Sequence, residues 1–387
     1  MNNQKHLFQL PNDIHYLNGA YMSPLLKSVE DIGIEGIIRK RNPLTIQPKD
    51  FFEDAKKVRI NFGKLVNCNP QQVVIIPSAS YGLMSAIKNL PINNGNTALV
   101  LSEEFPSDFY TIRKWCVENN KNLQIIEAPD IFEKRGEEWN KNILANINEN
   151  TCVVVLSSIH WTDGTLFNLE EIGQQCKKFN TIFIVDGTQS VGALSIDVTE
   201  YKIDALICAG YKWLLGPYSI GLAYFSEYFN KGIPLEETWM NKRNAKNFSS
   251  LTAYVEDYKS GAGRYNVGEY SNFILLPMLN KALEHILDWK VEAIQEYCNK
   301  LTKPLSTFVK ENDFWIEEDN YRAKHLFGLL LPQKINQEEL VKKFQERKIY
   351  VSMRGKAIRI SPYLYNTESD INILIETLTQ FKKKNHS

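Results

Sequence analysis

The chain has 387 residues, of which 43% are hydrophobic and 23% charged, an ordinary composition for a globular protein of two or three domains. Its 45 basic residues balance 45 acidic ones, so its net charge gives no reason to expect binding to nucleic acid or to an anionic membrane. The six cysteines form no CxxC pair, which argues against a disulfide scaffold or a metal site. We see no signal peptide and no apolar run long enough to span a membrane, so we expect a cytoplasmic protein.

Between about residues 70 and 230, short runs of β-branched and apolar residues alternate with amphipathic helical patterns. Strands are predicted at 72–76, 97–102, 122–128, 151–159, 181–187, 204–210 and 221–226, and helices at 80–90, 107–119 and 168–179. Strands that are apolar throughout are typical of sheets covered on both faces. We therefore expect an α/β domain with a mostly parallel, doubly wound sheet and helices on both faces.

From about residue 260 the pattern becomes that of a smaller α+β domain. A long helical stretch at 275–312 is followed by a strand at 324–332, a helix at 336–348, a strand at 357–362 and a helix at 368–384. Residues 230–262 are polar and without periodicity, so we expect a loop there. The predicted organisation is an N-terminal arm (1–30) that contributes to the small domain and the active site, a large α/β domain (31–260), and a C-terminal α+β domain (261–387) that begins with a long connecting helix.

Three ends of the predicted strands carry polar residues, and ligands of open α/β sheets bind beyond the carboxyl ends of the strands. One is the segment Ser78, Ala79 and Ser80, at the start of a predicted helix. Backbone N–H groups and hydroxyls there suit a phosphate, although a plain helix cap explains the same residues. Asp186 ends another strand, with Gln189 shortly after it, and Lys212 follows the next strand.

A phosphate loop, an aspartate and a lysine on neighbouring strand ends suit one ligand that carries a phosphate, a basic ring nitrogen and an aldehyde. Pyridoxal 5′-phosphate (PLP) has all three groups. In this interpretation Lys212 forms a Schiff base with the aldehyde, and Asp186 keeps the ring nitrogen protonated so that the ring withdraws electrons.

The segments "VDGTQSVGALSIDV" (185–198) and "AGYKWLLGP" (209–217) occur in the order and spacing of a known family. With "HYLNGAYMSP" (15–24) and "IRISPYLYNTESDI" (358–371), the chain resembles the class V aminotransferases. This family of fold-type I PLP enzymes includes cysteine desulfurases, kynureninases and isopenicillin N epimerase-like proteins. The resemblance implies a fold-type I structure, PLP as the cofactor, and a homodimer with active sites at the interface.

The resemblance also assigns roles to individual residues. It implies that Lys212 is the Schiff-base lysine and proton carrier with a lowered pKa, that Asp186 pairs with the ring nitrogen, and that Gln189 lies near the phenolic oxygen. It places the 78–80 segment around the phosphate. Phe105 falls where relatives stack a ring on the cofactor, with a core phenylalanine as the alternative.

Arg359 matches the family arginine that binds the substrate carboxylate, with an ordinary ion pair as the alternative. This match implies a small-molecule substrate that is an α-amino acid or a similar carboxylate.

Other positions depart from the desulfurase pattern. Residues 346–361 contain no cysteine, so we do not expect a thiol that forms a persulfide. Tyr211 precedes the lysine where many relatives carry histidine, and its hydroxyl is expected to reach the phosphate. Trp161 is expected to wall the pocket or pack against the cofactor. His160 is expected either to assist acid–base chemistry or to cap the strand end.

The segment 264–273 matches the part of the family fold that reaches the phosphate site of the neighbouring subunit. The usual Gly-Thr is Gly268-Glu269 here, and a glutamate repels a phosphate. Ser271 or Asn272 is therefore the candidate for that contact.

The leading expectation for the reaction is transamination of an amino acid. The alternatives are a PLP-dependent epimerase or lyase that resembles the isopenicillin N epimerase-like proteins, the kynureninases or the desulfurases. A non-catalytic protein with the same fold is a further alternative, which the presence of Lys212, Asp186, Gln189 and Arg359 argues against.

Overall fold

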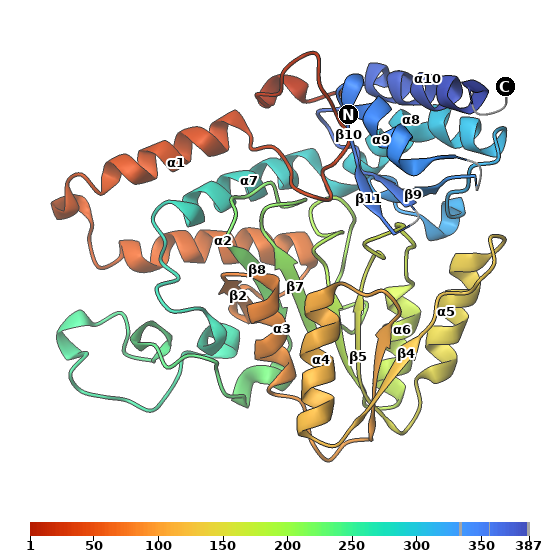
Figure 1. The fold of residues 1–387 in the computed structure, drawn as a ribbon. Helices are drawn as coiled ribbons and strands as arrows, with labels where there is room; N and C mark the ends of the chain where they lie inside the picture. The colour runs from red at the N-terminus through yellow and green to blue at the C-terminus, as the bar shows by residue number, and fades with distance from the viewer. Residues whose placement is uncertain (333–334, 356, 385–387) are drawn as a thin grey trace.

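The protein is described from a computed structural model that covers residues 1–332, 335–355 and 357–384 (Figure 1). The large sheet has the strand order β2-β8-β7-β6-β5-β3-β4. Its strands are β2 (Val73–Ile76), β3 (Thr97–Leu101), β4 (Asn122–Ile126), β5 (Thr151–Ser157), β6 (Ile182–Asp186), β7 (Ala205–Ala209) and β8 (Gly221–Phe225). Strand β8 runs antiparallel to both of its neighbours, and the other pairs are parallel. The predicted strands are thus confirmed.

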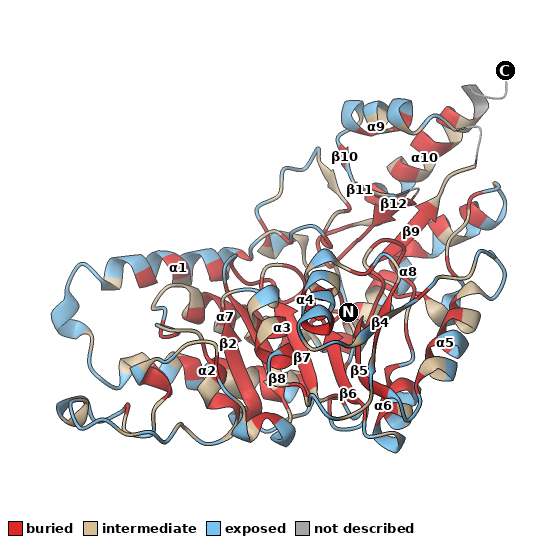
Figure 2. Ribbon diagram, turned by 60° about the horizontal axis from the view of Figure 1, so that its bottom comes forward, coloured by how far each residue is buried: buried red, intermediate tan, exposed pale blue. Residues whose placement is uncertain are grey.

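Apart from the partly exposed edge strand β4, the strands of this sheet are buried on both faces, and for that reason they are apolar at nearly every position (Figure 2). One face packs against α3 (Ala79–Ile87) and α4 (Pro106–Glu118). The other face packs against a larger set of helices: α2 (Asp50–Val66), α5 (Arg135–Asn146), α6 (Leu169–Lys178) and α7 (Leu275–Trp289). Helix α1 (Lys27–Arg39) lies on the outside of α7. The expected fold of a mostly parallel sheet with helices on both faces is present.

The C-terminal region folds around a second sheet of order β11-β12-β9, formed by β9 (Phe327–Leu330), β11 (Ser352–Arg354) and β12 (Ala357–Ile360). Helices α8 (Val291–Lys310), α9 (Gln337–Glu346) and α10 (Glu368–Lys384) pack against it. The N-terminal arm joins this region, because β1 (His15–Tyr16) pairs with β10 (Ile349–Tyr350) and Leu17 lies in the same buried cluster.

The predicted helix at 275–312 is two helices, and the prediction of one continuous stretch was wrong. The chain turns at Lys290, whose backbone has a φ of 65°, between α7 and α8. Helix α7 packs against α1 and α2 in the large domain, whereas α8 packs against α10. We propose that the C-terminal part of the small-domain core begins within α8, because Val291, Ile294 and Cys298 belong to the large cluster and the α8 residues from Leu301 onward to the small one.

Residues 230–262, predicted as a loop, contain short 3-10 turns and one isolated antiparallel bridge, between Lys242 and Tyr258. Within the described ranges, none of the helices combines the length and the apolar content that a bilayer span needs.

Candidate active site

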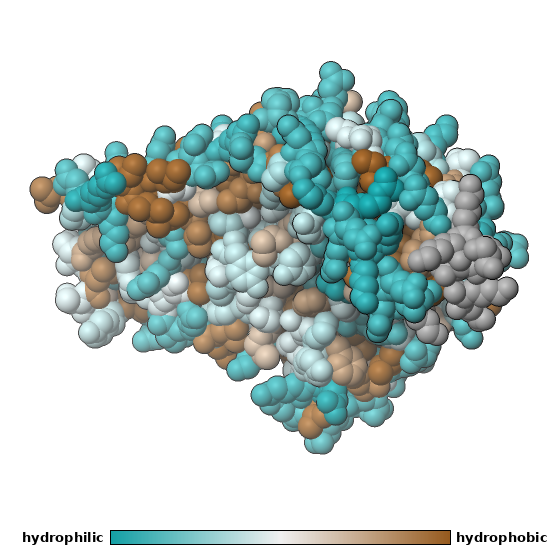
Figure 3. Space-filling view, turned by 45° about the horizontal axis from the view of Figure 1, so that its top comes forward, coloured by the Kyte–Doolittle hydropathy of each residue, from teal (hydrophilic) through white to brown (hydrophobic). Residues whose placement is uncertain are grey.

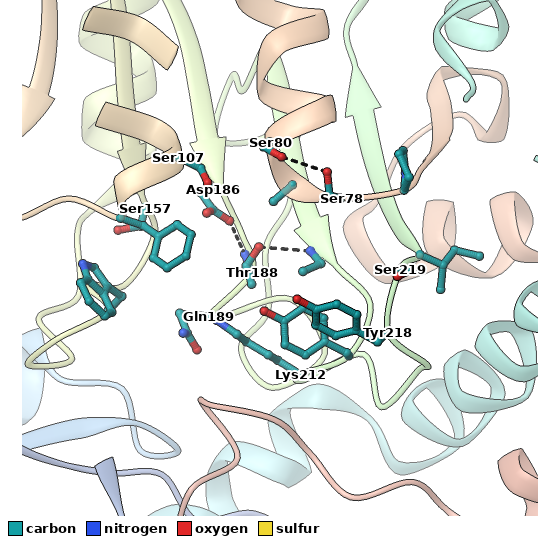
Figure 4. Close-up of a pocket in the computed structure, with 17 residues that line it drawn as sticks. Ser78, Ser80, Ser107, Ser157, Asp186, Thr188, Gln189, Lys212, Tyr218 and Ser219 are labelled. Carbon is teal, nitrogen blue, oxygen red and sulfur yellow. Dashed lines mark hydrogen bonds between the residues drawn. The ribbon is translucent and has the colours of Figure 1, made fainter. Parts of the chain in front are cut away.

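A cavity of about 300 Å³ opens where the sheet strands present their polar ends (Figure 4). Its lining comes from the turn between β2 and α3, the start of α4, the ends of β5 and β6, and the segment between β7 and β8. The lining includes every residue that the sequence nominated for the cofactor: Ser78, Ala79, Ser80, Phe105, Trp161, Asp186, Gln189, Tyr211 and Lys212. The sequence analysis expected several of them together because the carboxyl ends of neighbouring strands meet at one edge of the sheet.

Among the described residues that line this cavity, Lys212 is the one cation, and the residue is only 6% exposed. Its Nζ lies 5.7 Å from the ring centroids of both Phe105 and Tyr211. Burial, followed by the positive charge of Arg359, lowers its pKa to about 8. Roughly a tenth of this amine is therefore neutral at pH 7, against under about a thousandth for an exposed lysine, and a neutral amine is the form that attacks an aldehyde.

Asp186 ends β6 and is buried. Its Oδ1 accepts a hydrogen bond of 2.8 Å from the backbone N–H of Thr188. The Thr188 hydroxyl oxygen in turn accepts a hydrogen bond of 3.1 Å from the backbone N–H of Ala209, at the end of β7. These two bonds, drawn in Figure 4, tie the aspartate to the strand that leads to Lys212.

A second carboxyl, Asp108, lies beside Asp186 and was missed by the sequence analysis. It is fully buried in the first turn of α4, and neither of its oxygens has a hydrogen-bond partner. Burial, with the negative charges of Asp186 and Glu104, raises its pKa well above the usual value, which favours the neutral acid. The sequence carried a signal: Asp108, Ile112 and Trp115 follow the spacing of the apolar face of a helix.

The opposite end of the cavity is rich in hydroxyl groups. Ser78 caps α3 by accepting a hydrogen bond of 3.3 Å from the backbone N–H of Tyr81, and its Oγ lies 2.9 Å from that of Ser80. The first backbone N–H groups of a helix lack partners within it, which favours an anion at this position. Tyr211 and Tyr218 stand beside it with ring centroids 4.5 Å apart.

Gln189 is held in one orientation from three sides. Its Oε1 accepts a hydrogen bond of 3.0 Å from Trp213 Nε1, and its Nε2 donates one of 3.2 Å to the backbone oxygen of Ala20. The buried His325 donates from Nε2 to the Gln189 backbone oxygen, at 2.8 Å. These contacts leave one amide N–H of Gln189 for a ligand.

Phe105 and Trp161 form one wall of the cavity. Their rings meet edge to face with centroids 5.5 Å apart, and Trp161 Nε1 donates a hydrogen bond of 2.7 Å to the backbone oxygen of Glu103. Phe105 is only partly buried and lies outside the hydrophobic clusters of the described residues. Its position at the cavity favours contact with a ligand over the alternative of a core residue.

His160 does not line the cavity. It is buried against Trp139, its Nδ1 lies 2.8 Å from the Thr162 hydroxyl and 3.2 Å from Asp163 Oδ1, and its Nε2 donates to the backbone oxygen of Ser102 at 3.2 Å. Both ring nitrogens are thus engaged in the protein. Of the two expectations for His160, this geometry favours the structural one.

Arg359 lies on β12 with 1% of its side chain exposed. It donates a hydrogen bond of 2.9 Å to the backbone oxygen of Trp161, while its Nε has no partner. In the part of the chain that the structure describes, no carboxylate forms an ion pair with it, so the alternative of an ordinary ion pair is not supported. Burial, followed by the charge of Arg354, lowers its pKa to about 9.

The segment predicted to reach a neighbouring subunit does not line the cavity of its own chain. Glu269 is exposed, the hydroxyl of Ser271 lies 3.7 Å from Met240 Sδ, and Asn272 Oδ1 accepts hydrogen bonds from the first backbone N–H groups of α7. A cross-subunit contact by any of them stays a prediction. The described residues also contain no cluster of His, Cys, Asp and Glu side chains suited to a metal ion.

The groups that line the cavity fit the cofactor expected from the sequence. An amine of lowered pKa, the buried carboxyl of Asp186 and a hydroxyl-rich helix start lie around one space, and they match an aldehyde, a basic ring nitrogen and a phosphate.

Known proteins resemble this chain along most of its length. It is 21% identical to a kynureninase of Shouchella clausii, over 97% of this chain and 90% of that protein, and 22% identical to YcbU, an uncharacterised aminotransferase of Bacillus subtilis, over 85% and 84%. Its fold is similar to that of an apo cysteine desulfurase from Thermococcus onnurineus (TM-score 0.81, 17% identity, 99% of both chains). It is also similar to that of a cystine C–S lyase in complex with cysteine persulfide (TM-score 0.83, 17% identity, 96% and 98%).

The sequence profile described as "Aminotransferase class-V" matches residues 46–374, which span the large sheet, the cavity and the strand that carries Arg359. The motifs around Asp186 and Lys212, the fold and this match agree, and the chain belongs to the class-V aminotransferase family.

Proposed function

We propose that this chain is a PLP-dependent enzyme that binds its cofactor through Lys212 and acts at the α-carbon of an amino acid. The observation that carries the proposal is the buried Lys212 amine with a pKa of about 8, in one cavity with Asp186 and the hydroxyl-rich start of α3. When bound, PLP supplies an electron sink for the bonds at the α-carbon.

The residues of the chain have distinct parts in this proposal. Lys212, once freed from the cofactor, takes up the α-proton as a neutral amine, which its lowered pKa permits. Asp186 holds a positive ring nitrogen, and Ser78 and Ser80 hold the phosphate. Arg359 binds the α-carboxylate of the substrate, since its buried Nε has no hydrogen-bond partner in the protein and remains available to donate.

Transamination is the first candidate reaction, and the uncharacterised aminotransferase among the relatives supports it. A lyase is the second candidate, because a kynureninase matches over 97% of this chain and a C–S lyase shares the fold. A desulfurase that uses its own thiol has less support: no cysteine lines the cavity, and Cys208, the cysteine on β7, is buried with a pKa raised by burial and by Asp186.

An assay with and without a keto acid separates the two reactions. The holoenzyme is supplied with single amino acids, and the amino group, pyruvate and ammonia are followed. For transamination we expect the amino group to appear on the added keto acid, and no turnover without it. Release of ammonia or pyruvate without an acceptor would assign a lyase instead. If no amino acid is converted under either condition, the proposal of an amino-acid enzyme is wrong.

We also propose that the enzyme is a cytoplasmic homodimer. All six cysteines are unpaired, as expected in a reducing compartment. Exposed apolar side chains gather on α1 and the turn after it, where Ile37 is 59% and Leu44 85% exposed (Figure 3). A second copy of the chain fits such a patch. Sedimentation velocity tests this: we expect twice the chain mass for the wild type and dissociation in Ile37→Glu, whereas a monomeric wild type contradicts it.

A further inference from the structure

We propose that Arg354 and Arg359 act together and that the substrate is an α-amino acid whose side chain ends in a second carboxylate. The inference rests on the proposed function and names the substrate class of the same site. The observation behind it is a pair of neighbouring guanidinium groups beside the cavity, neither of which has an acidic partner among the described residues.

The register of the β11–β12 hairpin places the two arginines on one face. Ser352 pairs with Arg359, and Arg354 pairs with Ala357. Because side chains alternate along a strand, Arg354 points to the same side as Ser352 and therefore to the same side as Arg359. The two arginines are diagonal neighbours, with backbones about 7–8 Å apart, close enough to hold the two ends of one small molecule.

Both arginines contact Trp161, a residue that lines the cavity. Arg359 donates to the Trp161 backbone oxygen, and the Arg354 guanidinium lies 5.6 Å from the centroid of its ring. The same tryptophan lines the cavity together with Lys212. The charges of Arg359 and Arg354 both lower the pKa of the Lys212 amine, so both guanidinium groups lie within electrostatic range of it.

Neither arginine is neutralised by the protein. Each donates to a backbone oxygen, Arg354 to that of Met353 at 2.7 Å and Arg359 to that of Trp161, and each has a buried Nε without a partner. A nearby acid, Asp163, is already paired with Arg135 at 2.9 Å. Two cations held close together without an acid repel each other, and the arrangement becomes favourable when anions bind.

A single carboxylate can form a bidentate pair with only one of these guanidinium groups. The α-carboxylate of any amino acid binds Arg359, since that arginine is the more deeply buried. Arg354 then remains for a second planar anion, and the guanidinium fork binds a carboxylate through two parallel hydrogen bonds. The amide of asparagine or glutamine has the same shape but carries a donor in place of one acceptor and no charge, so Arg354 discriminates against it.

The test compares each acidic amino acid with its amide on the PLP-loaded protein. Dissociation constants of aspartate, asparagine, glutamate and glutamine are measured from the change that each causes in the visible absorption of the cofactor. In the wild type we expect at least one acid to bind about tenfold or more tightly than its own amide. Arg354→Met should reduce that ratio to below about twofold, and Arg354→Lys should restore part of it.

Arg347→Met is the matched control, because Arg347 follows α9 in the same domain and pairs with Glu376 outside the cavity. It should keep the wild-type ratio. Equal binding of acids and amides by the wild type overturns the inference, as does an equal loss of both in Arg354→Met.

A calorimetric arm separates this inference from the proposed function. Succinate has two carboxylates and no amine, so its binding requires the arginine pair but not amino-acid chemistry. We expect succinate to bind more tightly than its half-amide, and Arg354→Met to remove the difference. If no amino acid alters the spectrum but succinate keeps this preference, the proposed function fails and the dicarboxylate site stands. If the half-amide binds as tightly as succinate, the dicarboxylate site fails.

Discussion

At the scale of single residues, Lys212 lies in a buried position where the charged ammonium is unfavourable and the neutral amine is favoured. Burial disfavours the ammonium form of Lys212, and the positive charge of Arg359 disfavours it further. The negative charge of Asp186 favours the ammonium and partly offsets these two effects. The balance leaves the amine with a pKa of about 8, far below that of an exposed lysine. The same arginine that is proposed to bind the substrate therefore also lowers the pKa of the lysine.

This coupling predicts the pH dependence of cofactor uptake. Below its pKa the amine is protonated and unreactive, so the rate at which the apoprotein takes up PLP should rise with pH and reach half its maximum near pH 8. Arg359→Met removes a positive charge, which favours the ammonium, and should move the half-point to higher pH. Stopped-flow absorbance measures these rates. An unchanged or lower half-point in Arg359→Met would show that this charge does not act on Lys212.

At the scale of elements, the loop after β6 and the loop after β7 fix each other. Gly192 has a φ of 99°, and a Cβ built on it would lie 2.3 Å from the backbone oxygen of Trp213, the residue after Lys212. Tyr363 donates a hydrogen bond of 3.2 Å to the Gly192 backbone oxygen from the small domain. The position of the lysine thus depends on a glycine in a different segment.

Gly192→Ala should therefore cost roughly 2–5 kcal/mol of unfolding free energy, from the left-handed backbone and the overlap with Trp213 together. Gly355→Ala is the matched control, since Gly355 also has a positive φ, 56°, but no atom lies within 4 Å of its built Cβ. There we expect about 1–2 kcal/mol, from the backbone alone. Urea denaturation measures both variants, and equal losses would argue against tight packing between the two loops.

The strands were predictable because they are buried on both faces and read as continuous apolar runs. The helices were less predictable. No element was assigned to residues 27–66, where α1 and α2 lie, and the sequence at the break at Lys290 has no glycine or proline that would indicate a helix end. That break follows from packing, since α7 belongs to the large core, whereas α8 leaves that core along its length and joins the small one from Leu301 onward. Tertiary contacts of this kind are absent from a single sequence.

At the scale of the whole molecule, topology explains which parts of the site were predictable. Ser78, Asp186 and Lys212 were found because each follows a strand, and parallel strands end at one edge of a sheet. Asp108 and Arg354 were missed because their importance depends on neighbours from other elements. Asp108 meets Asp186 across the packing of α4 on the sheet, and Arg354 meets Trp161 where the small domain approaches the large one.

The central claim is that Lys212 is the residue that holds PLP, and chemical mapping tests it most directly. The holoenzyme is reduced with borohydride and digested, and the modified peptide is identified by mass spectrometry. The account predicts that the visible absorption of the cofactor bleaches and that the added mass lies on Lys212, with neither result in Lys212→Ala. Modification of another lysine, or a wild type that shows no visible absorption with PLP, would contradict it.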